Sequence, residues 1–148
     1  MRTFSLGRTF DAVISINSGI GYLTSEAHLA QAVHTMAAHL NPGGVLLVEG
    51  WVEPDYWLAD AGASLDTATD GDLAVARLTR TRRSGTVTEL FVRYDVASKD
   101  DTHSIDEHHV LRSDPTEFER AYTSAGLTFE RLPHMLRAGR AVYAGTSG

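Results

Sequence analysis

The fold of this chain follows from residues 11–49, DAVISINSGIGYLTSEAHLAQAVHTMAAHLNPGGVLLVE. Residues 11–16 are a short, nearly continuous apolar run, which is typical of a strand buried on both faces of a parallel sheet. Apolar residues at helical spacing predict a helix over residues 26–40, and Asn41-Pro42-Gly43-Gly44 should end it. Residues 45–49 then predict a second buried strand. This strand–helix–strand order predicts parallel pairing in an open α/β sheet.

A loop of small residues, Asn17-Ser18-Gly19-Ile20-Gly21, follows the first predicted strand. Glycine lets the backbone approach a ligand closely, and open α/β sheets bind ligands beyond the carboxyl ends of their strands. We therefore expect a ligand site within residues 15–22 and 49–57. Asp11 lies at the opposite end of its strand, so we expect it to cap a turn rather than to take part in chemistry.

The pattern changes after Gly71, where residues 73–80, 86–97 and 103–111 alternate apolar and polar side chains. Alternation is typical of antiparallel strands with one exposed face, and turns at residues 83–85 and 98–101 predict a three-stranded meander. The small, polar stretch 59–71 is predicted to be a surface loop.

The last third of the chain predicts a helix and two closing strands. Asp114 can cap a helix with Pro115 at its first position and Glu117 reaching back, and Gly126 should end it. Residues 127–132 and 140–145 predict antiparallel strands, because the loop between them is too short for a parallel crossover. We expect one domain over residues 1–148, with an α/β core at 1–57 and 114–148 and an antiparallel insertion at about 72–112.

Composition narrows the classes of partner. The chain has 148 residues, a formal net charge of −6 and no cysteine, so neither a basic field for nucleic acid nor a thiolate site is expected. No apolar segment approaches the ~20 residues of a membrane span, and no signal peptide is evident, so we expect no membrane partner and a cytoplasmic protein. We interpret His103, Glu107 and His109 as polar residues of a surface strand rather than as a metal site, so no metal is expected. His28, His34 and His39 are expected on the helix surface or rim.

Short motifs follow one another in a characteristic order: Phe10-Asp11-Ala12-Val13, Gly21-Tyr22-Leu23, Leu40-Asn41-Pro42-Gly43-Gly44 and Val48-Glu49. In order and spacing they resemble class I S-adenosylmethionine (SAM) dependent methyltransferases from the fourth strand of that fold onward. A closer resemblance, to the bacterial N,N-dimethyltransferases of TDP-linked amino sugars of the desosamine and mycaminose type, covers nearly the whole chain. It is carried by residues 1–8, 19–23, 49–51, 118–127 and 139–140. The resemblance implies a Rossmann-like sheet with an added antiparallel β meander.

The resemblance also implies a cofactor and residues that line it. It implies a cytoplasmic transferase of antibiotic biosynthesis that uses S-adenosyl-L-methionine as its cofactor. Met1 would directly follow an acidic residue that contacts the adenine, and Ile16, Asn17 and Ser18 would line the cofactor at the end of the fourth strand.

The implied substrate is a small molecule, a TDP-linked amino sugar. Tyr22 falls where relatives place a Tyr or a His close to the reacting amine, which makes it the candidate catalytic residue. A phenol there can hydrogen-bond or deprotonate a substrate ammonium, although methyl transfer to a neutral amine needs mainly alignment. Trp51 and Tyr56 would wall the sugar pocket, and Arg140 would hold the nucleotide pyrophosphate, a task suited to guanidinium.

The sequence also departs from the family pattern. Gly50 and Val52 stand where these relatives have a proline and a second aromatic, and no E/D-x-G-x-G-x-G occurs. The first three strand–helix units of the fold are therefore expected to be absent. The alternative function is a truncated, catalytically silent module that binds a partner or a second copy of itself, as a homodimer, through the open edge of the fourth strand. Trp51 and Trp57 would then be core or dimer contacts.

Overall fold

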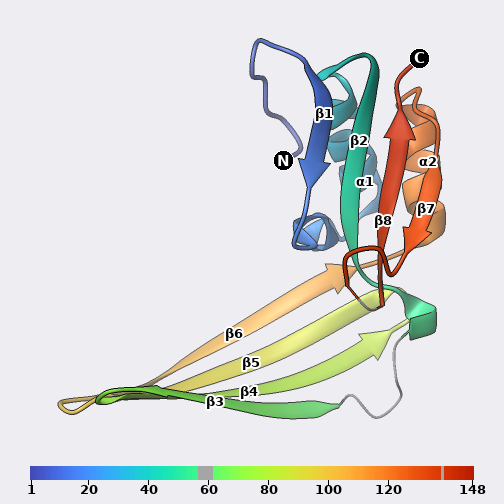
Figure 1. Cartoon of the computed structure of the whole chain (residues 1–148). Helices are drawn as coiled ribbons and strands as arrows, with labels where there is room; N and C mark the ends of the chain where they lie inside the picture. Colours follow the sequence, from blue (N-terminus) through green and yellow to red (C-terminus); the bar gives the residue numbers. More distant parts are fainter. Residues whose placement is uncertain (57–61, 138) are drawn as a thin grey trace. The chain divides into compact units, whose positions relative to one another are not determined.

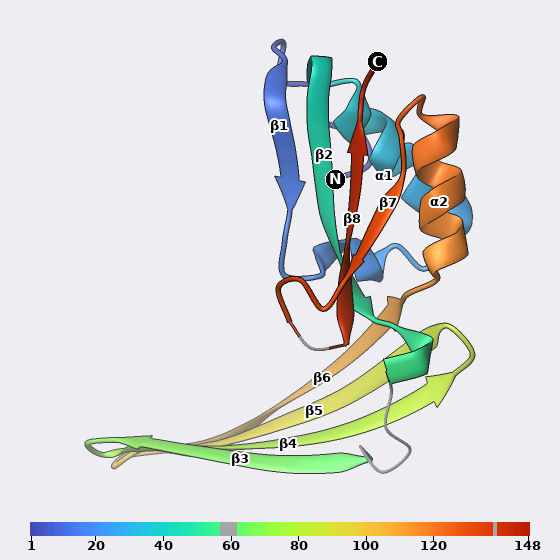
Figure 2. The ribbon, with the colours of Figure 1, turned by 45° about the vertical axis from the view of Figure 1, so that its right-hand side comes forward.

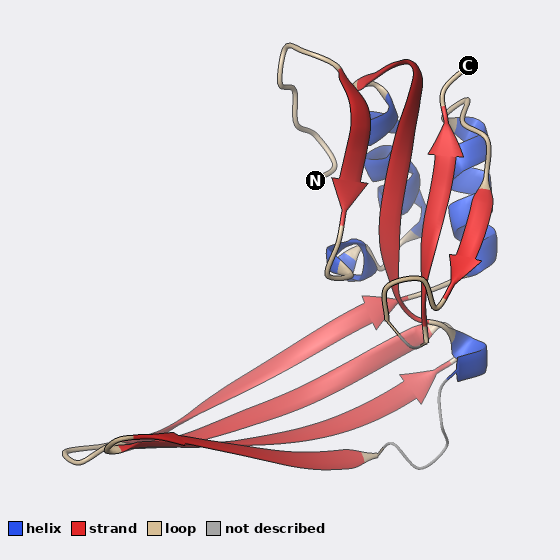
Figure 3. Cartoon of the chain, viewed as in Figure 1, coloured by secondary structure: helices blue, strands red, loops and turns tan. Residues whose placement is uncertain are grey.

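The structure is a computed structural model that describes residues 1–56, 62–137 and 139–148. The chain forms two compact units, one made of Met1–Trp57 with Leu111–Gly148 and the other of Leu58–Val110. Helices occur with strands in the first unit, and a sheet of strands makes up the second (Figure 3). No helix in the described ranges is long and apolar enough to span a membrane.

The first unit contains a four-stranded sheet in the order β1-β2-β8-β7 (Figure 1). Its strands are β1 (Phe10–Ser15), β2 (Leu40–Val52), β8 (Arg140–Thr146) and β7 (Glu130–Pro133). β1 and β2 are parallel, whereas β8 runs antiparallel to both β2 and β7. The predicted open α/β sheet and its antiparallel closing strands are confirmed. Among the described residues β1 pairs with β2 alone, so it is an edge strand of this sheet.

Strand β2 is longer than the sequence predicts. Phe10 pairs with Leu40, and the register then shifts so that Ala12 pairs with Val45. Residues 41–44, which are predicted to form only a turn, therefore lie in an irregular start of the strand. Asp11 lies at this end of the sheet, where its carboxylate accepts a hydrogen bond of 2.7 Å from the Asn41 amide. This contact agrees with a structural rather than a chemical role for Asp11.

Both helices of the first unit cover the same face of its sheet (Figure 2). They are α1 (Glu26–Ala37) and α2 (Pro115–Ser124), and their apolar sides pack on strand residues such as Leu46, Val48 and Tyr143. The opposite face has no helix among the described residues. Ile14 and Ile16 are therefore 61% and 56% exposed, so the prediction that the first strand is buried on both faces is wrong for this chain.

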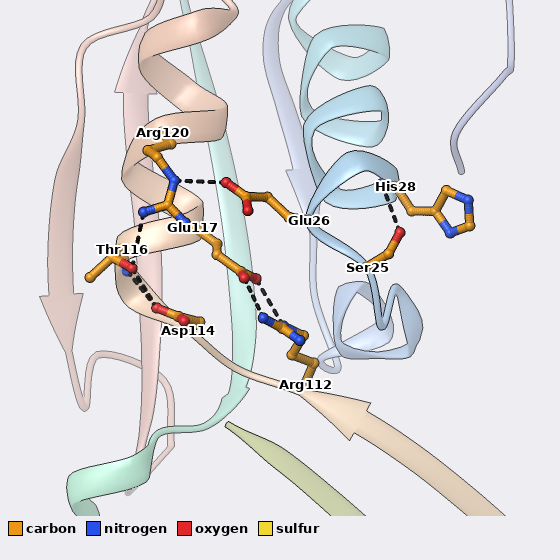
Figure 4. A network of polar contacts seen from close by, with 8 residues as sticks. All are labelled: Ser25, Glu26, His28, Arg112, Asp114, Thr116, Glu117 and Arg120. Carbon is orange, nitrogen blue, oxygen red and sulfur yellow. Dashed lines mark hydrogen bonds and ion pairs between the residues drawn. The ribbon is translucent and has the colours of Figure 1, made fainter. Parts of the chain in front are cut away.

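Polar contacts fix the first turns of the two helices (Figure 4). Ser25 and Asp114 cap α1 and α2 by accepting hydrogen bonds from the backbone of residues 28 and 116. The prediction that the Glu117 side chain reaches back toward its cap is wrong. Its buried carboxylate instead accepts a forked pair of hydrogen bonds from Arg112, which holds the chain entering α2. The exposed pair between Arg120 and Glu26 links the two helices and contributes little to stability.

Other segments of the first unit also depart from the sequence prediction. His39 is 8% exposed rather than a rim residue, because its Nε2 accepts from the Leu6 N–H at 3.1 Å and its Nδ1 faces the Thr35 carbonyl at 2.7 Å. Gly126, with φ of 76°, ends α2 as predicted. The strand predicted over 127–132 begins only at Glu130, since residue 127 forms an isolated bridge.

The second unit contributes a four-stranded antiparallel sheet in the order β3-β4-β5-β6. The strands are β3 (Ala63–Asp70), β4 (Leu73–Ser84), β5 (Val87–Ala97) and β6 (Thr102–Arg112). The predicted meander is confirmed, although its first turn lies at residues 85–86 because Arg83 and Ser84 belong to β4. The loop predicted over 59–71 is wrong for residues 63–70, and residues 57–61, with Trp57, lie outside the described part. Pairing with β4 makes β3 a strand, although its small and polar side chains give no apolar alternation.

The histidines of β6 pair with neighbouring carboxylates. His109 lies 3.0 Å from Glu107, and His103 lies 3.2 Å from Asp101. In the part of the chain that the structure describes, no three His, Cys, Asp or Glu residues gather in a group suited to a metal ion.

Candidate active site

The carboxyl ends of β1 and β2 meet at one edge of the first sheet, because these strands are parallel. The start of the antiparallel strand β8 reaches the same edge, where Val52 pairs with Arg140. The topology therefore brings together three segments that are far apart in sequence: residues 16–22, residues 49–53, and residue 137 with residues 139–140.

Asn17 and Ser18 form a tight turn after β1. Their φ angles are 61° and 55°, in the left-handed region that non-glycine residues adopt at a cost. Glu49 accepts a hydrogen bond of 2.6 Å from the Asn17 N–H, and the Ser18 hydroxyl donates one of 2.6 Å to the Gly50 carbonyl. Strand β2 thus fixes the turn that is expected to line the cofactor.

Arg140 lies in the middle of this cluster. Its side chain is 16% exposed, its Nη1 donates to the Ser18 hydroxyl at 3.0 Å and to Glu49 at 3.4 Å, and its guanidinium lies 4.6 Å from the centre of the Trp51 ring. Arg137 lies at the rim, with a 56% exposed side chain, a hydrogen bond of 3.1 Å to the Asn17 side chain and a distance of 3.9 Å to Glu49.

Trp51 forms one wall of the cluster and carries a buried donor. Its indole nitrogen has no hydrogen-bond partner among the described residues, which is unusual for a buried N–H. The short 3-10 helix η1 (Gly19–Tyr22) packs against it so closely that a Cβ on Gly21 would lie 3.1 Å from the Trp51 Cβ. A ligand acceptor that reached the indole nitrogen would satisfy it.

The remaining predicted residues lie around this edge. Tyr22 ends η1 with its side chain 53% exposed. The Met1 methyl lies 3.8 Å from where a Cβ on Gly19 would stand, next to the turn at Ser18. Tyr56, in the 3-10 helix η2 (Pro54–Tyr56), packs on Gly139, the neighbour of Arg140.

Ile16 lies on the open face of the sheet, where it borders an apolar cavity of about 190 Å³. The cavity is lined by Ile14, Ser15, Ile16, Leu47, Glu49, Met135, Leu136 and Val142. It adjoins the cluster through Glu49. An apolar hollow beside polar groups at a strand end is the form that small-molecule sites usually take.

Sequence reasoning assigned no role to two buried carboxylates at this edge, Glu49 and Glu53. Glu53 is 3% exposed and accepts two hydrogen bonds from Arg131, at 2.8 and 2.6 Å, and one from the Tyr143 hydroxyl at 2.9 Å. Burial, with a further contribution from the Glu53 carboxylate, raises the pKa of Tyr143, so this phenol stays protonated and donates. The sequence could have indicated Glu49, because this carboxylate follows directly after the apolar run 45–48, at the end of a strand where ligands are expected to bind.

Gly50, which replaces the proline of the relatives, lies directly beside the ring of Tyr143. A Cβ at this position would lie 2.8 Å from the Tyr143 ring, so any side chain there would displace the tyrosine. The residue that departs from the family pattern is therefore matched to a bulky neighbour on β8.

Known proteins resemble the chain in sequence and in structure. It is 40% identical over 134 residues, 89% of this chain and 56% of the relative, to dTDP-3-amino-3,4,6-trideoxy-alpha-D-glucopyranose N,N-dimethyltransferase of Streptomyces venezuelae. It is 37% identical over 150 residues, 100% of this chain and 58% of the relative, to dTDP-3-amino-3,6-dideoxy-alpha-D-glucopyranose N,N-dimethyltransferase of Streptomyces fradiae. A SAM-bound amino pentose methyltransferase from Micromonospora echinaspora, involved in calicheamicin biosynthesis, superposes with a TM-score of 0.86 at 32% identity, covering 99% of this chain and 62% of that one.

No family model matches the chain. The chain spans somewhat more than half the length of the curated relatives that it matches. Within that span the match is nearly continuous, and the fold expected from the resemblance is confirmed. The chain is thus a homologue of the TDP-amino-sugar N,N-dimethyltransferases and has the fold of the class I SAM methyltransferases over the part that they share.

Proposed function

We propose that the chain contributes the acceptor side of a SAM-dependent N-methyltransferase that acts on a nucleotide-linked amino sugar. The observation that carries the proposal is the convergence of the Asn17–Ser18 turn, Trp51 and Arg140 at one sheet edge in a chain homologous to sugar N,N-dimethyltransferases. The cytoplasm is the compartment expected for it, and a second copy of the chain remains a candidate partner.

The residues at this edge fit such a reaction. SAM would supply the methyl group, and the apolar cavity beside Ile16 together with the rigid turn at Asn17 and Ser18 would help to hold it. The neutral sugar amine would attack the methyl carbon in line as the methyl C–S bond breaks, so that S-adenosylhomocysteine leaves and the new ammonium gives its proton to solvent. Trp51 would wall the sugar, and its unpartnered indole N–H would donate to an acceptor on the ligand. The chain would act mainly by proximity and orientation, which suits attack by a neutral amine.

The decisive experiment measures methyl transfer from labelled SAM to TDP-3-amino-3,6-dideoxyglucose. One arm uses the chain alone, and the other uses the chain mixed with the part of the Streptomyces fradiae relative that it does not match. Transfer in either arm supports the proposal. If neither arm transfers methyl groups while the intact relative does, the proposed activity is wrong for this chain.

Tyr22 remains the predicted catalytic residue, placed at the end of η1 with its side chain half exposed. In whichever arm is active, Tyr22→Phe is expected to lower kcat/KM about tenfold near neutral pH, the worth of one hydrogen bond to a charged group. The loss should shrink at higher pH, where the amine is neutral without help. Tyr94→Phe, in β5 of the second unit, removes a phenol that is not one of the candidate site residues and serves as the control. An unchanged kcat/KM for Tyr22→Phe at all pH values would rule out the role.

A further inference from the structure

Residues 1–9, here called the strap, lie against helix α1 through few contacts. Phe4 is the half-buried residue of the strap, and the others are exposed. The Thr35 hydroxyl donates a hydrogen bond of 2.6 Å to a strap carbonyl, and the Leu6 N–H donates one of 3.1 Å to the His39 ring. A segment with so little buried surface opens at a low cost in free energy, so each hydrogen bond matters to its position.

The two partners of the His39 ring fix its tautomer. A carbonyl can only accept a hydrogen bond, so Nδ1, which lies 2.7 Å from the Thr35 carbonyl, carries a hydrogen. A backbone N–H can only donate, so Nε2, which faces the Leu6 N–H, carries none. The ring is 8% exposed, and its hydrogen bonds are therefore set by these protein groups rather than by solvent. The neutral ring with its hydrogen on Nδ1 satisfies both partners.

Protonation of His39 would break one of these two bonds and keep the other. Nδ1 carries a hydrogen in the neutral and in the charged ring, so the bond to Thr35 survives. Nε2 gains a hydrogen in the charged ring, which would then point at the Leu6 N–H, donor against donor. The Phe4 ring, with its centroid 4.6 Å from that of the imidazole, contacts either form but cannot restore the Leu6 bond.

The charged groups around the His39 ring do not favour a positive charge there. A cavity of about 610 Å³ between the strap and α1 is lined by His39 together with Arg8 and His34, and by no carboxylate. On β1, the Asp11 carboxylate accepts from the Asn41 amide. The ion pairs between histidine and carboxylate among the described residues all involve β6. A charged His39 would therefore gain no ion pair in exchange for the lost bond.

We propose that His39 is a pH-dependent switch, which holds the strap while its ring is neutral and releases the strap around Leu6 when the ring is protonated. An imidazole ordinarily takes up its proton between about pH 8 and about pH 5. Release would change the surroundings of the turn after β1, because the strap also places Met1 next to Gly19. The inference concerns the chain itself and does not depend on the proposed function.

NMR titration of the full chain from about pH 8 to about pH 5 provides the test. At the upper pH, the nitrogen chemical shifts of the His39 ring should show Nδ1 protonated and Nε2 bare. The rate at which the Leu6 N–H exchanges with water is divided by its intrinsic rate at each pH. This corrected rate is expected to rise about tenfold as the ring becomes charged, the worth of one lost hydrogen bond.

His39→Gln separates the charge of the ring from its hydrogen bond. The glutamine amide oxygen can accept from the Leu6 N–H but does not titrate, so the corrected exchange rate should become independent of pH. His34→Gln is the matched control, since it removes an exposed imidazole of α1 that lines the same cavity. The response of Leu6 to pH should persist in it. Circular dichroism checks that both variants fold, and the titration of the unmodified chain tests the switch even if His39→Gln does not.

Several results would overturn the inference. One is a neutral His39 ring that carries its hydrogen on Nε2, and another is a corrected Leu6 exchange rate that stays constant while the ring becomes charged. A response to pH that persists in His39→Gln would assign it to another group. A ring that stays neutral down to about pH 5 would show that His39 is a fixed anchor and no switch.

Discussion

Glu49→Ala is expected to lower the free energy of unfolding by about 3–5 kcal/mol, the range for removing one partner of a buried ion pair. The buried carboxylate receives the Asn17 N–H at 2.6 Å and the Arg140 guanidinium at 3.4 Å. Without it, a guanidinium that is only 16% exposed keeps its charge with no carboxylate nearby among the described residues. The strained turn at residues 17 and 18 also loses a tie to β2.

Urea unfolding of the full chain, followed by tryptophan fluorescence, measures this loss. Both tryptophans, Trp51 and Trp57, belong to the unit that contains Glu49, so unfolding of the second unit does not obscure the transition. Glu49→Gln is the matched variant, because its amide oxygen can still accept from Asn17 while the charge is gone. We expect a smaller loss for it than for alanine. A Glu49→Ala variant within about 1 kcal/mol of the unmodified chain would contradict the buried-pair interpretation.

Local sequence patterns predicted most of the first unit. The apolar run at 11–16, the helix from residue 26 and the cap at Asp114 each depend on contacts within a few residues, and the structure has all three. Burial on both faces could not be predicted from 11–16 alone. It depends on which helices cover the sheet, and those described cover one face only.

Strand β3 shows the limit of pattern in the second unit. Its residues 63–70 are exposed and mostly small or polar, so neither period nor propensity distinguishes them from a loop. They become a strand by hydrogen-bonding along β4, from Ala63 with Arg80 to Asp70 with Leu73. This pairing depends on β4, whose alternation of apolar and polar residues did predict a strand.

In the candidate site, too, some features could be predicted from local sequence and others could not. Asn17, Ser18 and Trp51 follow apolar strands, so the rule that ligands bind at carboxyl strand ends was enough to nominate them. The ion pairs of Glu49 with Arg140 and of Glu53 with Arg131 join residues about 80 to 90 positions apart. Their partnership depends on the antiparallel return of β7 and β8 beside β2, which a local pattern does not encode. Phosphate binding by Arg140 stays a prediction, and its contacts with Ser18 and Glu49 are what the local pattern could not show.

Phe118→Ala is expected to cost about 3–5 kcal/mol of stability, as truncation of buried phenylalanines does. The Phe118 ring is 2% exposed and stacks on Tyr143, with centroids 3.9 Å apart. Tyr143 in turn donates to Glu53, and its carbonyl accepts from Tyr122 at 2.9 Å. A cavity at position 118 would thus free the tyrosine that anchors the buried carboxylate at the end of β2.

The consequence can be measured separately from the loss of packing. Phe118→Leu keeps most of the apolar volume and is expected to cost clearly less than alanine in urea unfolding. Tyr143→Phe keeps the stack but removes the donor to Glu53, and should cost about 1.5–3 kcal/mol, the worth of a hydrogen bond to a charged group. If Phe118 acts through Tyr143, the double variant Phe118→Ala/Tyr143→Phe will lose less stability than the two single losses added together. Strict additivity would instead show that the α2 contact and the Glu53 anchor stabilise the sheet independently.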